Sequence, residues 1–412
     1  MATPFFALLA GIALAPLFFA SWWARHYVKV TFGLAAITLV YYFTVLRAPE
    51  RVLHTGMDYI SFICLIGSLF VISGGIHINV KGEATPKVNV VFLFIGALVA
   101  NFLGTTGASM LFIRPWLRMN KYRLTAHHVV FFIFVISNVG GCLTPIGDPP
   151  LFLGYLQGVP FWWVAEKCWP IWLTGVGILL AIFYVVDRLN FTRAPKEVRV
   201  RETSHEEWRF SGLTNLFWLA VVLGSVFVNH PVFLRELLMA GATLASYFTT
   251  PKSVYESNDF NFHPIKEVAI LFAGIFATMM PALDWLEANA ARFGAPSPGL
   301  VYWGSGTLSS VLDNAPTYLG FLSAAQGGLT GGTTMSEALK DTEFAKSLLA
   351  ISIGSVFFGA STYLGNGPNF MVKAIADQQK AHTPSFLGYI FKFTLPFMLP
   401  VLMVVWWMFF RS

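Results

Sequence analysis

Long apolar segments recur along the whole chain and are separated by short polar loops. Ten of them are long enough for a helix to cross the roughly 30 Å hydrocarbon core of a bilayer. They cover residues 5–22, 29–46, 58–78, 126–158, 169–189, 211–229, 231–249, 266–288, 346–376 and 385–410. Their apolar residues are continuous rather than alternating, which favours helices over a membrane β-barrel. The pattern predicts an all-α, multi-pass (polytopic) membrane protein.

Two further apolar stretches, residues 89–112 and 299–325, are interrupted by polar residues. The interruption reads LGTTGAS at 103–109 and LDNAPT at 312–317. Because each half is too short to cross the membrane, we expect two re-entrant hairpins that return to the side they entered. Such irregular backbone is tolerated at membrane depth only inside protein or beside a water-filled cavity.

The order of segments is repeated in two halves, residues 1–189 and 211–412. Each half has a span, a hairpin and then a long broken span, at 126–158 and at 346–376. The broken spans contain SNVGGCLTPIGDPPLF (137–152) and VFFGASTYLGNGPNF (356–370). The aligned pairs are Gly141 with Gly359, Thr144 with Thr362, Gly147 with Gly365, and Asp148 with Asn366. About five crossings in each half, an odd number, require the two copies to be inverted.

Charge and composition fit this interpretation. Charged residues make up 12% of the chain and apolar residues 56%, whereas soluble domains carry about 25% charged residues. Basic residues gather in the loops at 81–87, 113–125 and 188–210, which the positive-inside rule assigns to the cytoplasm. We therefore expect 190–210 to be a cytoplasmic linker between the halves. We interpret the net charge of +6 as basic residues that set the orientation in the membrane and contact lipid headgroups, and no nucleic-acid partner is expected.

Helices broken at matching positions of two inverted halves are typical of secondary transporters. The break exposes carbonyl groups that can coordinate Na⁺ and N–H groups that can hold an anion. We expect the breaks to be shaped by glycines, namely Gly104, Gly141, Gly147, Gly359 and Gly365. Sodium is the expected coupling ion, and no covalently bound cofactor is expected.

Asp148 and Asp313 are the only acidic residues deep in the predicted core segments. An ionisable group at mid-membrane is costly to bury and is therefore a candidate functional residue, although each aspartate could also cap a half-helix. Neutral oxygens suited to a hard cation come from Asn138, Asn314, Asn366, Asn369, Thr105, Thr106, Ser137, Thr144, Thr317, Ser361 and Thr362. The predicted sodium ligands are Asp313, Asn314, Asn138 and Asp148. His127 and His128 are interpreted as anchors at the lipid headgroups.

Three motifs resemble the ion transporter superfamily. They are NVGGCLTPIGDPP (138–150), LDNAPT (312–317) and GASTYLGNGPN (359–369). The superfamily includes citrate- and dicarboxylate-type carriers and the sodium/proton antiporter and arsenite-permease branch. The resemblance implies a homodimer in the bacterial inner membrane, in which a transport domain moves elevator-fashion against a scaffold domain.

The choice of substrate depends on the hairpin tips. Carboxylate carriers of this superfamily usually have Ser-Asn-Thr at each tip, whereas residues 104–106 here read Gly-Thr-Thr and residues 313–317 read Asp-Asn-Ala-Pro-Thr. The acidic residues Asp148 and Asp313, and the lack of a deep arginine to pair an anion, favour sodium/proton antiport. The alternative is sodium-coupled symport of citrate or a similar di- or tricarboxylate. A channel, an arsenite-like substrate and an intramembrane aspartyl protease remain less favoured, and no enzymatic motif is present.

Overall fold

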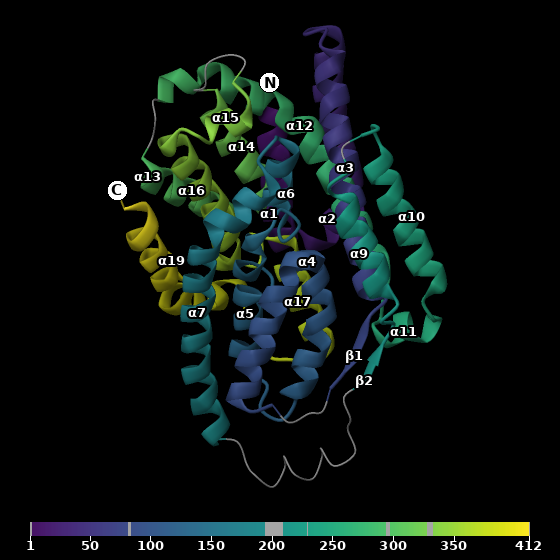
Figure 1. Ribbon diagram of the computed structural model, residues 1–412, viewed down its shortest axis with the longest axis vertical. Helices are drawn as coiled ribbons and strands as arrows, with labels where there is room; N and C mark the ends of the chain where they lie inside the picture. Colours follow the sequence, from purple (N-terminus) through teal and green to yellow (C-terminus); the bar gives the residue numbers. More distant parts are fainter. Residues whose placement is uncertain are drawn as a thin grey trace.

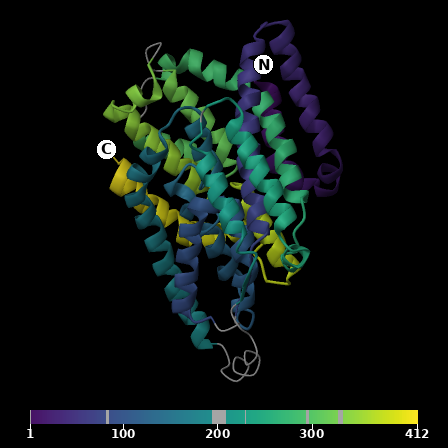
Figure 2. The same cartoon turned by 45° about the vertical axis from the view of Figure 1, so that its right-hand side comes forward.

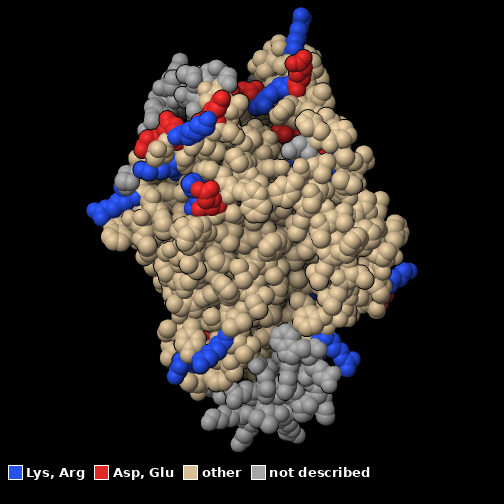
Figure 3. Space-filling model, in the orientation of Figure 1, with Lys and Arg blue, Asp and Glu red and all other residues tan. Residues whose placement is uncertain are grey.

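Long helices make up most of this computed structural model, which describes residues 2–80, 84–193, 209–228, 230–293, 297–327 and 333–411 (Figure 1). Within those ranges, eight helices are long and apolar enough to cross a membrane. On the face shown in Figure 3, charged side chains gather toward the two ends of the molecule and leave an almost uncharged band between them. The protein is thus an integral, multi-pass membrane protein.

The first half of the chain folds into seven helices, a short strand and a 3-10 turn within its described residues. These are α1 (Thr3–Phe18), α2 (Ala20–Thr44), α3 (Pro49–Gly74), β1 (His77–Asn79), α4 (Pro86–Met119), α5 (Ala126–Val135), the turn η1 (Val139–Leu143), α6 (Pro149–Leu156) and α7 (Phe161–Arg193).

The second half begins with β2 (Arg209–Ser211), α9 (Asn215–Ser225), α10 (Leu234–Thr249), α11 (Lys252–Ser257) and α12 (His263–Phe293). It continues with α13 (Pro298–Ser309), α14 (Asn314–Gln326), α15 (Met335–Ala338), α16 (Thr342–Phe358), the turn η2 (Gly359–Ser361) and α17 (Gly367–Gln378). The last helix is one run of α18 (Phe386–Tyr389), η3 (Ile390–Met398), α19 (Leu399–Val405) and η4 (Trp406–Phe410), in which η3 and η4 are π-helical.

The first predicted hairpin is present and is longer than the expected 89–112. A straight helix of 34 residues would be about 51 Å long, yet the two ends of α4 meet. The backbone N–H of Ala84 donates to the carbonyl of Met119 at 3.2 Å, and Phe92 stacks on Trp116 at 5.6 Å. The reversal occurs at Gly104, whose φ of 71° and ψ of 158° lie outside the helical region.

The second hairpin consists of α13 and α14, which meet at residues 310–313. Its arms pack against each other, because a Cβ at Gly304 would lie 3.3 Å from the Phe321 ring. The base of the α4 hairpin lies at the lower end of the molecule in Figure 1, whereas α13 and α14 lie toward the upper end. The two hairpins therefore enter the bundle from opposite ends.

Both broken spans are interrupted near the middle of the molecule. In the first, α5 ends at Val135 and α6 starts at Pro149; in the second, α16 ends at Phe358 and α17 starts at Gly367. In Figure 1, α5 and α17 occupy the lower half and α6 and α16 the upper half, so the two breaks lie at similar height. The α4 hairpin packs on α17, and α14 packs on α6.

Three predicted spans are shorter than a membrane crossing. The sequence predicts spans at 5–22, 211–229 and 231–249, but α1, α9 and α10 have 16, 11 and 16 residues, or about 24, 17 and 24 Å. The physical reason is local backbone geometry that apolar composition does not reveal. Phe19 leaves the helical region after α1, and Phe233, with a φ of 67°, precedes α10.

A two-stranded sheet departs from the all-α prediction. Antiparallel β1 and β2 pair His77 with Ser211, Ile78 with Phe210 and Asn79 with Arg209. The ends of the predicted linker 190–210 are therefore structured, since residues 190–193 extend α7 and 209–211 form β2. The rest of that linker lies outside the described residues.

The remaining helices pack beside this central group. Helix α2 packs on α12, α10 packs on α3, and α3 also contacts α12 and the α4 hairpin. Seen from the second angle, α2 forms the right-hand edge of the molecule (Figure 2), and α1 packs on α2 and α12. Helix α3 thus lies between the outer helices and the group that holds the two breaks.

Candidate functional site

The two interrupted helices meet through the residues that precede their second halves. Asp148 precedes α6 and Asn366 precedes α17, and both have extended backbone. Neither side chain caps its own helix. Instead, the amide of Asn366 donates to Oδ1 of Asp148 at 3.0 Å. The two positions that align in the sequence are therefore joined to each other, and the capping interpretation of Asp148 is wrong.

Both hairpin tips also reach Asp148. The Thr105 hydroxyl, just after Gly104, donates to Oδ1 at 2.6 Å. The Asn314 amide, at the start of α14, donates to Oδ2 at 2.6 Å. The Asp148 carboxylate thus receives three side-chain hydrogen bonds from three separate segments, and all four residues are buried.

A second polar network continues from this group. Asn366 also donates to the Ser137 carbonyl at 3.0 Å and contacts Oδ1 of Asn138 at 3.3 Å. Asn138 donates to Oδ1 of Asn369 at 2.7 Å, and Asn369 donates to the Gly359 carbonyl at 2.7 Å. Free carbonyl groups at the breaks are thereby satisfied by asparagine side chains, that of Ser137 from the opposite half and that of Gly359 from its own half.

Glycines allow the backbone at each break to come very close to itself. A Cβ at Gly147 would lie 2.0 Å from the carbonyl oxygen of Gly141, and one at Gly365 would lie 2.6 Å from that of Gly359. No real side chain fits at such distances. The equivalent contact at both breaks explains why glycine stands at these four aligned positions.

Asp148 forms no ion pair with any described residue, and one oxygen beside it has no partner. Oδ1 of Asn314 is buried and receives no hydrogen bond within the described structure. A cavity of about 20 Å³ adjoins the carboxylate and is lined by Thr105, Thr106 and Leu65, among others. That volume holds a water molecule or an ion but not a tricarboxylate.

The predicted sodium ligands are divided by the structure. Asp148 and Asn314 lie together, and Asn138 is linked to them only through Asn366. Asp313 instead caps α14 by accepting from the Ala315 N–H at 3.1 Å. Capping therefore accounts for Asp313, whereas Asp148 keeps the properties of a cation ligand.

Several other predicted site residues bind backbone rather than one another. Thr144 donates to the Asn101 carbonyl and Thr362 to the Ser310 carbonyl, each at 2.6 Å, which ties each break to a hairpin. Thr317 donates to the carbonyl four residues earlier. The Ser137 hydroxyl pairs with Ser109 at 2.7 Å.

The last two predicted site residues, Ser361 and Thr106, lie at the second break and at the small cavity. Ser361 is buried, and its carbonyl accepts from Thr394 at 2.7 Å. Thr106 lines the 20 Å³ cavity.

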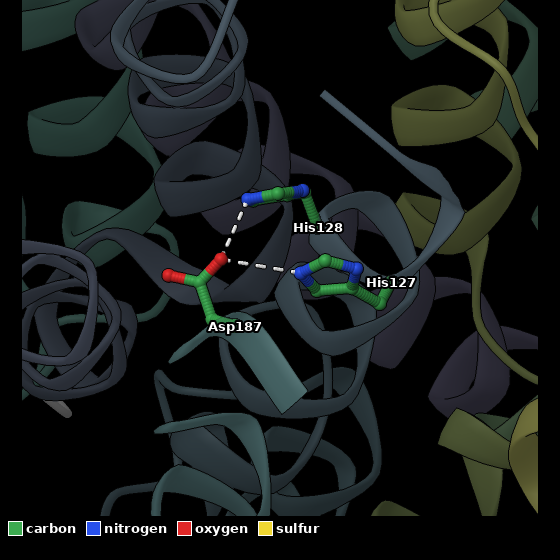
Figure 4. A group of neighbouring side chains, drawn as sticks. All are labelled: His127, His128 and Asp187. Carbon is green, nitrogen blue, oxygen red and sulfur yellow. Dashed lines mark hydrogen bonds and ion pairs between the residues drawn. The ribbon is translucent and has the colours of Figure 1, made fainter. Parts of the chain in front are cut away.

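A second polar cluster lies at the other end of α5 and was not anticipated. His127 and His128 both point at Oδ1 of Asp187, from 3.3 and 3.1 Å (Figure 4). Arg123 binds both oxygens of Asp187. All four residues are buried, so the prediction that the histidines anchor at headgroups is wrong. Asp187 is a further buried acidic residue, outside the hairpins and broken spans in which Asp148 and Asp313 were singled out.

These residues could be mistaken for a metal centre. However, the Thr125 N–H donates to Nδ1 of His128 at 3.3 Å, so Nε2 carries the proton that Asp187 accepts. The guanidinium of Arg123 already provides the positive charge that balances the Asp187 carboxylate, so no metal ion is needed there. The cluster is therefore better described as an ion pair that ties α5 and α7 to the base of the first hairpin, where Asn89 donates to Asp187 at 2.9 Å. The sequence signal was an aspartate that directly follows the long apolar run of residues 168–186 in α7.

A family model described as "Putative citrate transport" matches residues 1–410. No curated protein matches the chain.

Proposed function

Because the chain belongs to the family described as "Putative citrate transport", we propose that it is a secondary carrier that couples the movement of citrate, or a similar di- or tricarboxylate, to a cation. The family favours the carboxylate alternative over the sodium/proton antiport that the acidic residues alone favour. The proposal concerns substrate and coupling, since the family and the fold already make this a membrane transporter.

One observation supports coupling of transport to a cation: Asp148 is 1% exposed and has no cationic partner among the described residues. An ionised carboxylate is costly to bury unless a charge compensates it. A proton or a sodium ion would supply that charge. The unpartnered Oδ1 of Asn314 adds a second oxygen of the kind that hard cations prefer.

The first hairpin tip is the proposed contact for the substrate carboxylates. Thr105, Thr106 and Gly107 begin the second arm of the α4 hairpin and line the cavity beside Asp148. The start of a helix presents backbone N–H groups that favour an anion. The second halves of the broken helices are poorer donors, since Pro149, Pro150 and Pro368 lack an N–H. Substrate and cation would then bind side by side, which couples their movement.

Transport requires this site to open, and the elevator arrangement offers a route. Leu65, Ile66 and Leu69 of α3 cover the cavity on the side of the outer helices. This apolar patch contributes no hydrogen bond between the two groups, so sliding would break only contacts elsewhere, such as the Gln157–Asp58 and Tyr155–Val226 hydrogen bonds. We propose that the hairpins and broken helices form the moving unit of two inverted repeats, and that two copies of the chain assemble as a dimer.

The test is uptake of labelled citrate by proteoliposomes under an imposed sodium gradient, an imposed proton gradient, or neither. We expect uptake above the no-gradient level under one of the two gradients. Asp148→Asn should lower it by about 100-fold or more, equal to roughly 2.7 kcal/mol, while the variant still folds. Asp377→Asn is the matched control, because Asp377 is exposed and pairs only locally with Lys373 and Thr383.

Two results would contradict this proposal. Equal uptake by wild type and Asp148→Asn would remove Asp148 from coupling. No uptake of any tested carboxylate, together with collapse of a preset proton gradient when Na⁺ or Li⁺ is added, would establish sodium/proton antiport instead. Sodium/proton antiport stays the alternative function because one carboxylate without a cationic partner can also bind Na⁺ and H⁺ in competition.

A further inference from the structure

A larger cavity, of about 460 Å³, lies apart from the candidate ion site. Its walls are the start of α3, the loop between α6 and α7, the start of α10 and Ser336 of α15. Figure 1 places these elements toward the end of the molecule opposite the base of the first hairpin, hence away from the basic loops. The volume is in the range of ordinary small-molecule sites.

Arg235 is the cationic side chain among the residues that line this cavity, and only part of its guanidinium is occupied. Its Nε and Nη2 both contact Oε1 of Glu236, at 2.9 Å each, and Nη2 also lies 2.9 Å from the Ser61 hydroxyl. Its Nη1 group makes no hydrogen bond or ion pair with a described residue. A guanidinium with two open N–H donors is suited to a carboxylate.

The carboxylates of the cavity already have partners. Glu236 accepts from Ser61 at 2.5 Å as well as from Arg235. Asp58 accepts from Gln157 at 3.1 Å and lies 3.4 Å from His54. Both acids thus have a partner, although the lining carries two carboxylates against one guanidinium and Oδ1 of Asp58 accepts no hydrogen bond from a described residue. The open Nη1 group of Arg235 is therefore the part of the lining that favours an anion. The expectation that no arginine lies deep in the membrane concerns a different level of the molecule, since Arg235 is the second residue of α10 and its side chain is 16% exposed.

The surrounding backbone adds to the attraction for an anion. Two long helices begin at the cavity wall, α7 directly after Pro160 and α10 directly after Phe233. The start of each helix carries a partial positive charge. These dipoles reinforce Arg235 and do not compete with it.

The large cavity and the ion site lie along one seam between α3 and α6. On α3, Asp58 and Ser61 line the large cavity, and Leu65 and Leu69 line the small one. These positions follow helical spacing and so share one face. On α6, Tyr155 and Leu156 belong to the first cavity and Pro149 and Phe152 to the second. Leu65 of α3 and Phe152 of α6 line the small cavity on this seam, on the same helices as the large one.

We propose that the large cavity is a first docking site for the carboxylate substrate, in which the Nη1 group of Arg235 binds one carboxylate before the substrate passes along the α3–α6 seam to Asp148. The inference rests on the proposed function and adds a residue that determines capture rather than coupling. Citrate is the probe for its test.

The kinetic test compares wild type with Arg235→Gln in the citrate-uptake assay. We expect KM to rise about tenfold while the maximal rate stays within about twofold, because only capture is weakened. Arg51→Gln is the matched control: Arg51 is also paired with a carboxylate, that of Asp284, but does not line the cavity. An unchanged KM in Arg235→Gln would overturn the proposal.

A double variant separates docking from a merely structural ion pair. Arg235→Gln leaves Glu236 without its cation, which could disturb α10 by itself. Arg235→Gln/Glu236→Gln removes both charges. If Arg235 only neutralises Glu236, KM returns to the wild-type value and the proposal fails. If Arg235 binds substrate, KM stays raised in the double variant.

A binding test works without transport and so distinguishes failure of this inference from failure of the proposed function. Ser336→Cys is introduced together with Cys64→Ala and Asp148→Asn; Cys142 and Cys168 are buried. Citrate should slow modification of Cys at 336 by a charged thiol reagent, and adding Arg235→Gln should abolish this protection. Protection that persists without Arg235, or no protection at all, contradicts docking. Absence of uptake by wild type with protection intact would count against the proposed function alone.

Discussion

Two aspartates that looked alike in the sequence have different roles at the scale of single residues. Asp148 and Asp313 both precede a helix near mid-membrane. Asp313 caps its helix through the Ala315 N–H, as expected for that position. Asp148 cannot cap in the same way because Pro149 and Pro150 follow it, and its carboxylate is instead surrounded by donors from both halves. Only the neighbours distinguish a cap from an ion ligand.

Asn314 provides the sharpest test of the ion site at this scale. Asn314→Ala removes both the hydrogen bond to Asp148 and the unpartnered oxygen. We expect the half-saturating concentration of the coupling cation to rise about tenfold, or roughly 1.4 kcal/mol, measured by varying that cation in the uptake assay. Asn289→Ala is the control, since Asn289 is half-buried and its side chain donates to the Trp285 carbonyl of its own helix. Equal cation dependence in both variants would exclude Asn314 as a ligand.

At the scale of elements, the first hairpin depends on one backbone conformation. Gly104 combines a φ of 71° with a ψ of 158°, a region that is essentially restricted to glycine. A Cβ there would also lie 3.3 Å from the Ile146 carbonyl. Gly104 thus sets the shape of the hairpin tip. It also fixes the position of Thr105 and the approach of the tip to the break beside Asp148.

Gly104→Ala should therefore destabilise the protein by about 1–3 kcal/mol and lower uptake. The change is measured as a loss of Tm in detergent. Gly33→Ala serves as the control, because Gly33 lies inside α2 with open space around it and alanine is the better helix former there. Opposite signs for the two substitutions are expected; a Gly104→Ala variant as stable as wild type would contradict the hairpin geometry.

The buried ion pair at the base of α5 is the second element-level feature. Arg123, His127 and His128 converge on Asp187, which joins α5, α7 and the base of the α4 hairpin. Removing one partner of a buried pair leaves an uncompensated charge. The cluster should therefore stabilise the molecule more than an exposed ion pair does.

Asp187→Asn is expected to lower the free energy of unfolding by roughly 3–5 kcal/mol. Asp284→Asn, which affects the more exposed pair with Arg51, should lower it by about 1 kcal/mol or less. Both are compared by thermal unfolding of the purified protein. Similar losses in the two variants would show that the Asp187 cluster is not energetically distinct.

At the scale of the whole molecule, the two hairpins enter from opposite ends and their tips converge on one carboxylate. The base of the first lies beside basic residues such as Arg123, and acidic residues such as Glu343 follow the second. With the positive-inside rule, this arrangement places the 460 Å³ cavity on the outer side, where a substrate would arrive for uptake.

Labelling of single introduced cysteines tests this orientation in intact cells. Lys340 and Lys121 are both exposed and lie on opposite ends of the molecule. We expect Lys340→Cys to react with an impermeant thiol reagent from outside, and Lys121→Cys to react only after permeabilisation. The reverse pattern would invert the orientation and place the large cavity on the cytoplasmic side.

The sequence by itself determined the breaks, the hairpins and the membrane class. Glycines, prolines and long apolar runs act through local backbone preferences, so their effect can be read without knowing the neighbours. The lengths of α1, α9 and α10 were overestimated because apolar composition does not show that α1 ends before Phe19 or that α10 starts only after Phe233.

Only the tertiary structure decided which polar groups meet. Thr105, Asn314 and Asn366 are far from Asp148 along the chain, and packing of both halves brings them to one carboxylate. Likewise, the chain path alone does not show that Asp187 faces two histidines, or that Arg235 opens into a cavity on the seam leading to Asp148. A side chain's partners are set by long-range packing, because that packing determines which buried polar groups can satisfy one another.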